Sequence, residues 1–243
     1  MADMADMADT KDMTETDTVD VDNPTRWKLN IRVPSDWVEL AGTQTADEAL
    51  AVIRGALDAV DVELPAQDAG LLLAGLRAWR EVWGSQSVLL HGLVYQGKEY
   101  RGPTAIDEEI FVNVVGSVRQ LDAFDGPLSL LEVVRRVVAA RTGLDLSAAY
   151  TESFETGIGP ALGLTVTYPV DVRDPAAPQD TTGRSREIGL AVVVTAPQDG
   201  GPGLVLVGWS SEPHHVQAVG MLLAAMAGPA KIVPVNAQGE EIG

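Results

Sequence analysis

The chain has 243 residues, 46% of them hydrophobic, and a formal net charge of −18. It contains no cysteine, which excludes disulfides, thiolate metal sites and a thiol nucleophile. The excess of 35 acidic over 17 basic residues argues against a nucleic-acid binder and against anionic lipid surfaces, because both need a positively charged face. No apolar run approaches the roughly 20 residues of a membrane span. We therefore expect a globular protein without membrane insertion.

Residues 1–24 are predicted to form a disordered acidic tail. The chain opens with a threefold Met-Ala-Asp repeat, and residues 1–25 hold seven Asp and one Glu against one Lys, a net charge of about −7. A secretory signal needs a basic start and a continuous apolar centre, which this segment lacks, so we expect a cytoplasmic protein. The tail acts either as a solubilising extension or as an acidic docking arm.

A strand and a helix are predicted first after the tail. In residues 26–34 apolar side chains alternate with polar ones up to Pro34, as is typical of an amphipathic strand: Trp27, Leu29, Ile31 and Val33. A turn at 35–37 follows. Thr45 and Glu48 then have the spacing of a capping box. The helix that they open carries one apolar stripe, formed by Leu50, Ile53, Leu57 and Val60.

A second helix is predicted from Pro65, a residue that suits a first helical turn. Its apolar face is formed by Leu72, Leu76, Trp79 and Trp83. Trp79 and Trp83 lie one turn apart and make a single broad apolar surface. This surface either covers the sheet or anchors a protein partner, since aromatic residues are favoured at interface centres. Trp79 and Trp83 are therefore the candidate partner-binding residues.

The rest of the chain is predicted to be rich in strands. An antiparallel hairpin is expected from 87–95 and 106–115, and a helix between Asp125 and Gly143. Four further strands are expected at 150–158, 162–168, 187–196 and 204–209. A long exposed loop at 170–186 is expected between the second and the third of them.

A final helix is predicted from Pro213, with Ser211 as its N-cap. Its buried face is expected to comprise Val216, Val219, Gly220 and Leu223. The end of the chain, from Gly228, is expected to be loose.

This order of elements predicts an α+β fold, with a central, mostly antiparallel sheet and helices packed on its faces. Neither candidate boundary divides the pattern, because each lies between strands that would lose their partners. We expect a single domain over 25–235 and a loose C-terminus at 236–243. The alternative is a pair of similar halves, 26–145 and 146–235.

The candidate chemistry is limited to a few polar residues. Only three histidines are present, and His91, within an alternating strand, is expected to be a partly buried structural residue. His214 and His215 lie in the first turn of the last helix, at the positive end of the helix dipole. Together with Ser210 or Ser211 they form the nearest approach to a nucleophile and its base. The competing interpretation is an N-cap serine beside solvent-exposed histidines.

Other motifs are rejected on geometry. Asp107, Glu108 and Glu109 alternate between strand faces and cannot converge on one bond. The glycine series over 157–163 is followed by a strand, whereas a dinucleotide site needs a helix N-terminus to hold the pyrophosphate. We therefore assign no catalytic residue, no cofactor and no metal ligand.

Both ends of the folded region resemble a known family. The segment 27–40, with its Val33-Pro34 and Trp37, looks like the start of actinobacterial Mog1/PsbP-like proteins. The segment 205–213 is similar to their closing strand, Ser-x-Pro turn and helix. The resemblance implies helices packed on a central antiparallel sheet, with a late β-hairpin before a C-terminal helix. It also implies an accessory role near type VII-like secretion or membrane-associated systems, without a catalytic constellation.

The sequence is compatible with three functions. The first is a cytoplasmic, non-enzymatic adaptor or chaperone that binds a protein partner, possibly a basic one, because an acidic surface steers basic partners toward it. The second is a small hydrolase that uses Ser210 or Ser211 with His214 or His215. The third is a structural subunit of a larger assembly.

Overall fold

A computed structural model describes residues 26–43, 45–64, 69, 89–96, 110–135, 145–172, 184–236, 238, 240 and 241. Up to residue 135 the elements are β1 (Arg26–Asn30), β2 (Trp37–Glu39), α1 (Ala46–Asp58), β3 (Leu90–Gln96), β4 (Ile110–Leu121), the 3-10 turn η1 (Pro127–Ser129) and α3 (Leu130–Val134). From residue 145 they are β5 (Tyr150–Glu155), β6 (Pro160–Val172), β7 (Arg184–Thr195), β8 (Gly201–Ser210), the 3-10 turn η3 (Pro213–His215), α5 (Val216–Ala227) and β9 (Lys231–Val235). The fold is α+β, as predicted.

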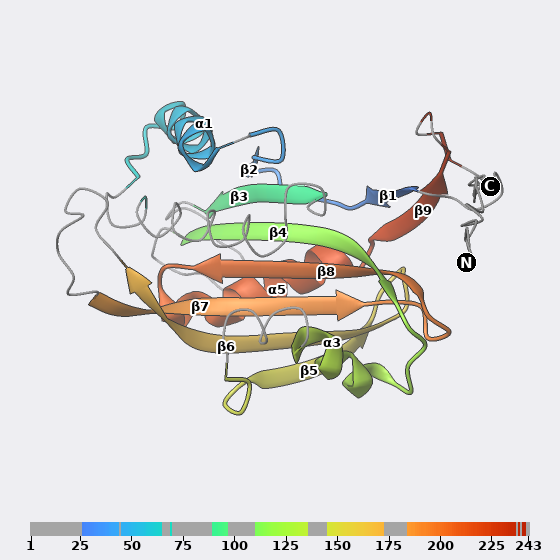
Figure 1. The fold of residues 1–243 in the computed structure, drawn as a ribbon. Coiled ribbons are helices and arrows are strands. Elements are labelled where there is room, and N and C mark those ends of the chain that lie inside the picture. Colours follow the sequence, from blue (N-terminus) through green and yellow to red (C-terminus); the bar gives the residue numbers. More distant parts are fainter. Residues whose placement is uncertain are drawn as a thin grey trace, which may run out of the picture.

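Seven of the described strands form one sheet in the order β2-β3-β4-β8-β7-β6-β5, and β1 pairs with β9 in a separate ribbon (Figure 1). Every described neighbour pair is antiparallel. Strand β8 lies between β4 and β7, so that Val207 pairs with Val115 on one side and Val192 on the other. The β8 pairings therefore join the strands of the first part of the chain to those of the second.

Helices cover both faces of the sheet, α5 on one side and α3 on the other (Figure 1). Val219, Leu223 and Met226 of α5 pack against one face. Leu130 and Val134 of α3 pack on the opposite face. Because β7 and β8 are covered on both sides, they form nearly continuous apolar runs instead of alternating.

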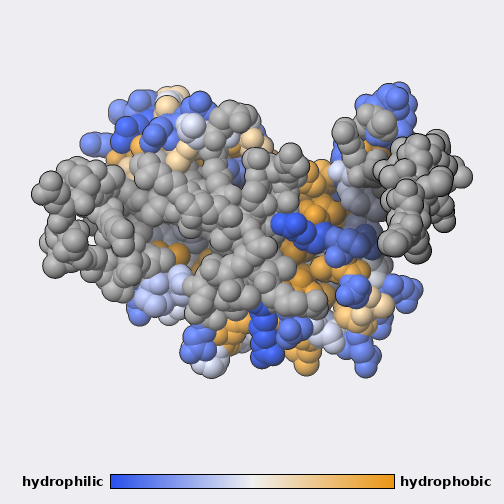
Figure 2. Space-filling view, viewed as in Figure 1, coloured by the Kyte–Doolittle hydropathy of each residue, from blue (hydrophilic) through white to orange (hydrophobic). Residues whose placement is uncertain are grey.

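The face with α3 also carries α1, whose buried side chains pack with Leu93 and Phe111 of the sheet. Figure 2 shows this face. Mostly hydrophilic residues cover α1, and hydrophobic residues come to the surface between the β1–β9 ribbon and α3. Among the described residues, no helix is long and apolar enough to cross a bilayer.

The predicted capping box of α1 is confirmed. The Thr45 Oγ1 accepts a hydrogen bond from the Glu48 amide at 3.1 Å, and the Glu48 side chain accepts one from the Thr45 amide at 3.2 Å. The predicted apolar stripe is correct for Leu50, Ile53 and Leu57, which are buried. Val60 is 59% exposed, because α1 ends at Asp58 and Val60 lies in the turn that follows it.

Several sequence predictions need correction. The expected loop over 170–186 is shorter, since β6 continues to Val172 and β7 begins at Arg184. The expected turn around Trp37 leads into the short strand β2, which pairs with β3. The end from Gly228 is not loose, because β9 pairs with β1 along its length. The predicted helix from Pro65, and the end of the one between Asp125 and Gly143, lie outside the described residues.

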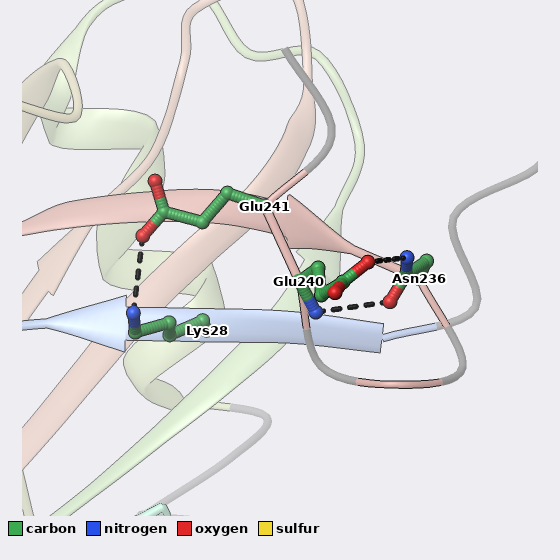
Figure 3. A network of polar contacts seen from close by, with 4 residues as sticks. All are labelled: Lys28, Asn236, Glu240 and Glu241. Carbon is green, nitrogen blue, oxygen red and sulfur yellow. Dashed lines mark hydrogen bonds and ion pairs between the residues drawn. The ribbon is translucent and has the colours of Figure 1, made fainter.

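The β1–β9 ribbon is closed by polar contacts at the end of the chain (Figure 3). The Lys28 Nζ lies 3.0 Å from the Glu241 Oε1, and the hydrogen bond with Lys28 lowers the pKa of Glu241. The Asn236 Oδ1 accepts from the Glu240 amide at 2.9 Å, and its Nδ2 donates to the Glu240 carboxylate at 3.0 Å. These contacts hold the segment from Asn236 to Glu241 against the β1–β9 ribbon.

We predict that Thr45→Ala destabilises the protein by about 1 kcal/mol, because it removes the side-chain acceptor of the capping box. Urea unfolding measures the change. Arg54→Ala, at an exposed position of the same helix, is the control and should change stability by less than about 0.5 kcal/mol. Equal effects of the two substitutions would contradict a stabilising role for the cap.

We predict that Lys28→Met raises the pKa of Glu241, measured by NMR titration of its side-chain carboxyl signal. In the folded protein this pKa is lowered, so the contact contributes stability above the unfolded-state pKa of Glu241 and loses it as the pH falls through the folded-state value. The shift should shrink at high salt, since both groups are exposed. An unchanged titration midpoint would show that the ion pair does not form in solution.

Candidate functional site

The turn between β8 and α5 brings together two residues of the hydrolase hypothesis. Ser210 ends β8 and His215 ends η3, and the Ser210 Oγ lies 3.3 Å from the His215 Nδ1. Both residues are 1% exposed. The pairing that the sequence suggested is therefore present, but it lies inside the protein.

The burial of this pair argues for a structural role. A nucleophilic serine must reach a substrate carbonyl, and a side chain 1% exposed has no such access in this conformation. The Ser210 Oγ also accepts a hydrogen bond from the Glu212 amide at 3.4 Å. The hydroxyl thus links the end of β8 to the turn that starts α5.

Ser211 and His214 do not join this pair. The prediction that Ser211 caps the last helix is wrong, because neither η3 nor α5 has a side-chain cap. The nearest equivalent is the contact made one residue earlier by Ser210. The expectation of exposed histidines is correct for His214, whose ring lies 4.2 Å from that of His215, and wrong for the buried His215.

The structure describes some of the other candidate residues from the sequence. His91 lies within β3, as predicted, and at 5% exposure it is more deeply buried than the predicted partly buried residue. The glycine series at 157–163 leads from β5 into β6, so no helix N-terminus stands there to bind a pyrophosphate. Asp107, Glu108 and Glu109, like Trp79 and Trp83, lie outside the described residues. Across the described residues, no group of three or more His, Asp or Glu side chains is placed to hold a metal ion.

A groove between α5 and the sheet is the candidate binding site, and we call it the α5–β5 groove. Its volume is about 280 Å³. Its walls and floor are formed by Tyr150, Glu152, Phe154, Gly163, Leu164, Thr165, Val192, Val193, Gln217, Gly220, Met221 and Ala224. The groove lies on the face covered by α5, near the edge of the sheet at β5.

The groove exists because α5 lies over the middle of the sheet. The helix packs mainly on β7 and β8, and it approaches β6 closely where Gly220 faces Thr165. A Cβ at Gly220 would lie 2.7 Å from the Thr165 Cγ2, so a side chain there would force α5 outward. Strand β5 therefore extends beyond the flank of the helix.

The floor of the groove is left open by Gly163. This residue pairs with Glu152 across the β5–β6 hairpin, and antiparallel partners share a face. A Cβ there would lie 3.3 Å from the Phe154 ring, a tight contact that a small shift of the ring relieves. The missing side chain provides much of the space between the edge strand and the helix.

The lining is mostly apolar, with the polar side chains of Thr165 and Gln217 and one acidic group. Tyr150 is 58% exposed and Met221 is 53% exposed, although both are large hydrophobic residues beside an open groove. Glu152 is the charged residue among the described lining residues. Such a surface can receive an apolar side chain and attract a neighbouring positive charge.

The sequence analysis does not predict the α5–β5 groove. The signal that could have located it is the glycine turn at 157–159, because the length of a hairpin turn fixes its register. Counting back from that turn places Gly163 opposite Glu152, with Tyr150 and Phe154 on the same face. The position of α5 over this face depends on tertiary packing.

A second hollow of about 240 Å³ lies where β9 meets the turns of the sheet. It is lined by Gly157, Ile158, Pro197, Pro202, Lys231, Ile232 and Val233. Its walls combine residues of β9 with residues at the β5–β6 and β7–β8 turns.

Comparisons with known proteins give a distant structural likeness. No protein-family model matches the chain, and no curated protein matches it. Among solved structures the chain is similar to LpqN of Mycobacterium tuberculosis, which is described as involved in cell envelope biogenesis. The identity is 12% and the TM-score 0.40, over 88% of this chain and 87% of that one. At this similarity LpqN carries no inference about the activity of this chain.

We predict that Ser210→Ala destabilises the protein by about 1–3 kcal/mol, because it removes a buried hydroxyl that contacts the His215 ring and the Glu212 amide. Ser211→Ala is the matched control and should change stability by less than about 0.5 kcal/mol. Chemical denaturation measures both. A larger loss for Ser211→Ala would restore Ser211 as the cap of the last helix.

Proposed function

We propose that this protein is a non-enzymatic accessory protein, an adaptor or chaperone, that binds a protein partner through the α5–β5 groove. The observation that carries the proposal is the groove itself, with the large hydrophobic residues Tyr150 and Met221 exposed along it. Exposed apolar surface beside a concave site is typical of an interaction site, since burying it removes that surface from water.

Charge supports a partner with basic residues near the contact. The chain carries a net charge of −18, and Glu152 lies within the groove. Strand β5 also has Glu155, and neither β5 nor α5 contains a Lys or Arg. An acidic surface of this kind accelerates the approach of a positively charged partner and disfavours nucleic acid.

The remaining parts of the proposal come from the sequence. We propose Trp79 and Trp83 as a further contact surface for the partner, and a cytoplasmic location. We also propose that the chain is a Mog1/PsbP-like accessory protein of the type associated with type VII-like secretion. The support is the resemblance of 27–40 and 205–213 to that family and the order of strands and helices between them.

The two other hypotheses have less support. A hydrolase would require Ser210 and His215 to become accessible, and both are buried. A structural subunit would require self-association, which size-exclusion chromatography at several protein concentrations detects. A concentration-dependent oligomer that survives filling of the α5–β5 groove would favour that alternative.

We predict that Gly163→Val abolishes capture of the partner, because its methyl groups enter the space between β5 and α5. Capture uses the full chain as bait in extract of the native host at about 50 mM salt, with bound proteins quantified by mass spectrometry. Thr151→Val, on the opposite face of β5, is the control and should retain the partner. Raising the salt to about 500 mM should slow association markedly.

The proposal fails if Gly163→Val captures the same partner as the unmodified chain while remaining folded by circular dichroism. Trp79→Ala together with Trp83→Ala tests the second surface in the same experiment. Loss of the partner in that variant, with retention in Thr151→Val, would support the tryptophans as a contact.

A further inference from the structure

Strand β5 is an outer strand of the seven-stranded sheet. It pairs with β6 on one side, and no described strand pairs with it on the other. Five of its six residues are exposed, the exception being the partly buried Phe154. The opposite edge of the sheet is β2, which has three residues. Strand β5 is therefore the longer exposed edge of this sheet.

The hairpin register shows which backbone groups point outward from β5. The Thr156 amide donates to the Gly159 carbonyl at 3.0 Å, so this pair closes the β5–β6 ladder. In an antiparallel ladder every second residue bonds to the same neighbour, which assigns residues 154, 152 and 150 to β6. The Pro160 carbonyl agrees with this, because it accepts from the Ala196 amide on the β7 side. The backbone groups of Thr151, Ser153 and Glu155 thus face away from the sheet.

The described charges of this edge are two glutamates, Glu152 and Glu155, and other common protections against strand pairing are missing from β5 itself. Natural edge strands commonly carry Lys or Pro, or are twisted by a bulge. Strand β5 has neither residue, and its pairing with β6 is continuous from Tyr150 to Glu155. Its side chains also alternate, so that Tyr150, Glu152 and Phe154 line the α5–β5 groove while their neighbours point to the other face.

We infer that β5 is a docking edge, to which an extended segment of a basic protein partner adds as a further antiparallel strand. The inference rests on the proposed function and specifies how the groove is used. The added strand pairs with the outward backbone groups of Thr151, Ser153 and Glu155. Its alternate side chains lie beside the groove and follow the order apolar, basic, apolar.

The order follows from the residues that each side chain meets. Directly opposed side chains in an antiparallel pair lie about 4.5–5.5 Å apart at Cβ. A lysine or arginine opposite Glu152 forms an ion pair, and apolar side chains opposite Tyr150 and Phe154 cover their rings. A second copy of β5 fits less well as the added strand. It would bring four glutamates, Glu152 and Glu155 of each copy, to one strand interface, where their like charges repel.

The test uses the full-length protein and the peptide Ser-Val-Thr-Lys-Thr-Val-Ser, which places Val, Lys and Val on one face. Binding is followed by NMR, with the affinity taken from amide shifts and strand pairing from protection against hydrogen exchange. We expect the amides of Thr151, Ser153 and Glu155 to become protected. A peptide with central Glu, and one with both threonine amides N-methylated, should each bind about tenfold more weakly.

Ser153→Pro is the decisive variant. Proline removes the outward amide of residue 153 and leaves the ladder to β6 intact, as is tolerated at an edge. It should weaken the Lys peptide about tenfold, whereas Ser153→Val, which keeps the amide, should bind as the unmodified chain does. Glu152→Lys should reverse the preference in favour of the Glu peptide. Unfolding midpoints confirm that each variant is folded.

Unchanged affinity in folded Ser153→Pro, absent protection of the three amides, or no binding of the Lys peptide would overturn strand addition. The proposed function fails separately, when Gly163→Val still captures the partner. Capture that is lost in Gly163→Val and kept in Ser153→Pro would retain the groove and reject the docking edge. A dimer of the chain alone that Ser153→Pro disrupts would assign the edge to a second copy and reject the partner.

Discussion

The insertion of β8 between β4 and β7 determines much of this structure. Every residue from Gly203 to Ser210 is buried, so the strand contributes apolar surface to both faces. It also sets the position of α5, since a Cβ at Gly208 would lie only 3.0 Å from a methyl group of Val219. At the end of the strand, Ser210 contacts His215 just before the helix begins. The α5–β5 groove follows, because a helix seated on β7 and β8 leaves the outer strand uncovered.

The parts of the fold that the sequence predicts are those with a local cause. The capping box of Thr45 and Glu48 needs three residues of spacing, and the pairing of β3 with β4 needs alternation in two neighbouring segments. The β5–β6 turn is missed, because the strand predicted over 150–158 runs through it. Strand β2 has three residues, too few for a pattern, and forms only because β3 offers it a partner. Strand β9 includes Pro234, which normally argues against a strand, but here it lies in a two-stranded ribbon opposite Trp27.

In the candidate site, too, the sequence predicts local relations between residues but not their tertiary surroundings. The sequence places Ser210 and His215 near each other along the chain, but only the packed structure shows that they are buried. The α5–β5 groove depends on the register of the β5–β6 hairpin and on the position of α5, which is distant in the sequence. The position of α5 is set by tertiary packing, which local sequence patterns do not predict. Both cases show that residue type and spacing indicate which groups can meet, whereas access to solvent decides what those groups can do.

The β1–β9 ribbon has a consequence for the order of folding. Arg26 pairs with Val235, so the ribbon closes a loop of about 200 residues, whereas the β5–β6 hairpin closes a loop of a few. The entropy cost of closure rises with loop length, and contacts between distant residues form slowly. Assembly of the sheet brings the two segments within reach before they pair. The ribbon is therefore a late step, and the transition state for folding is expected to resemble the sheet without it.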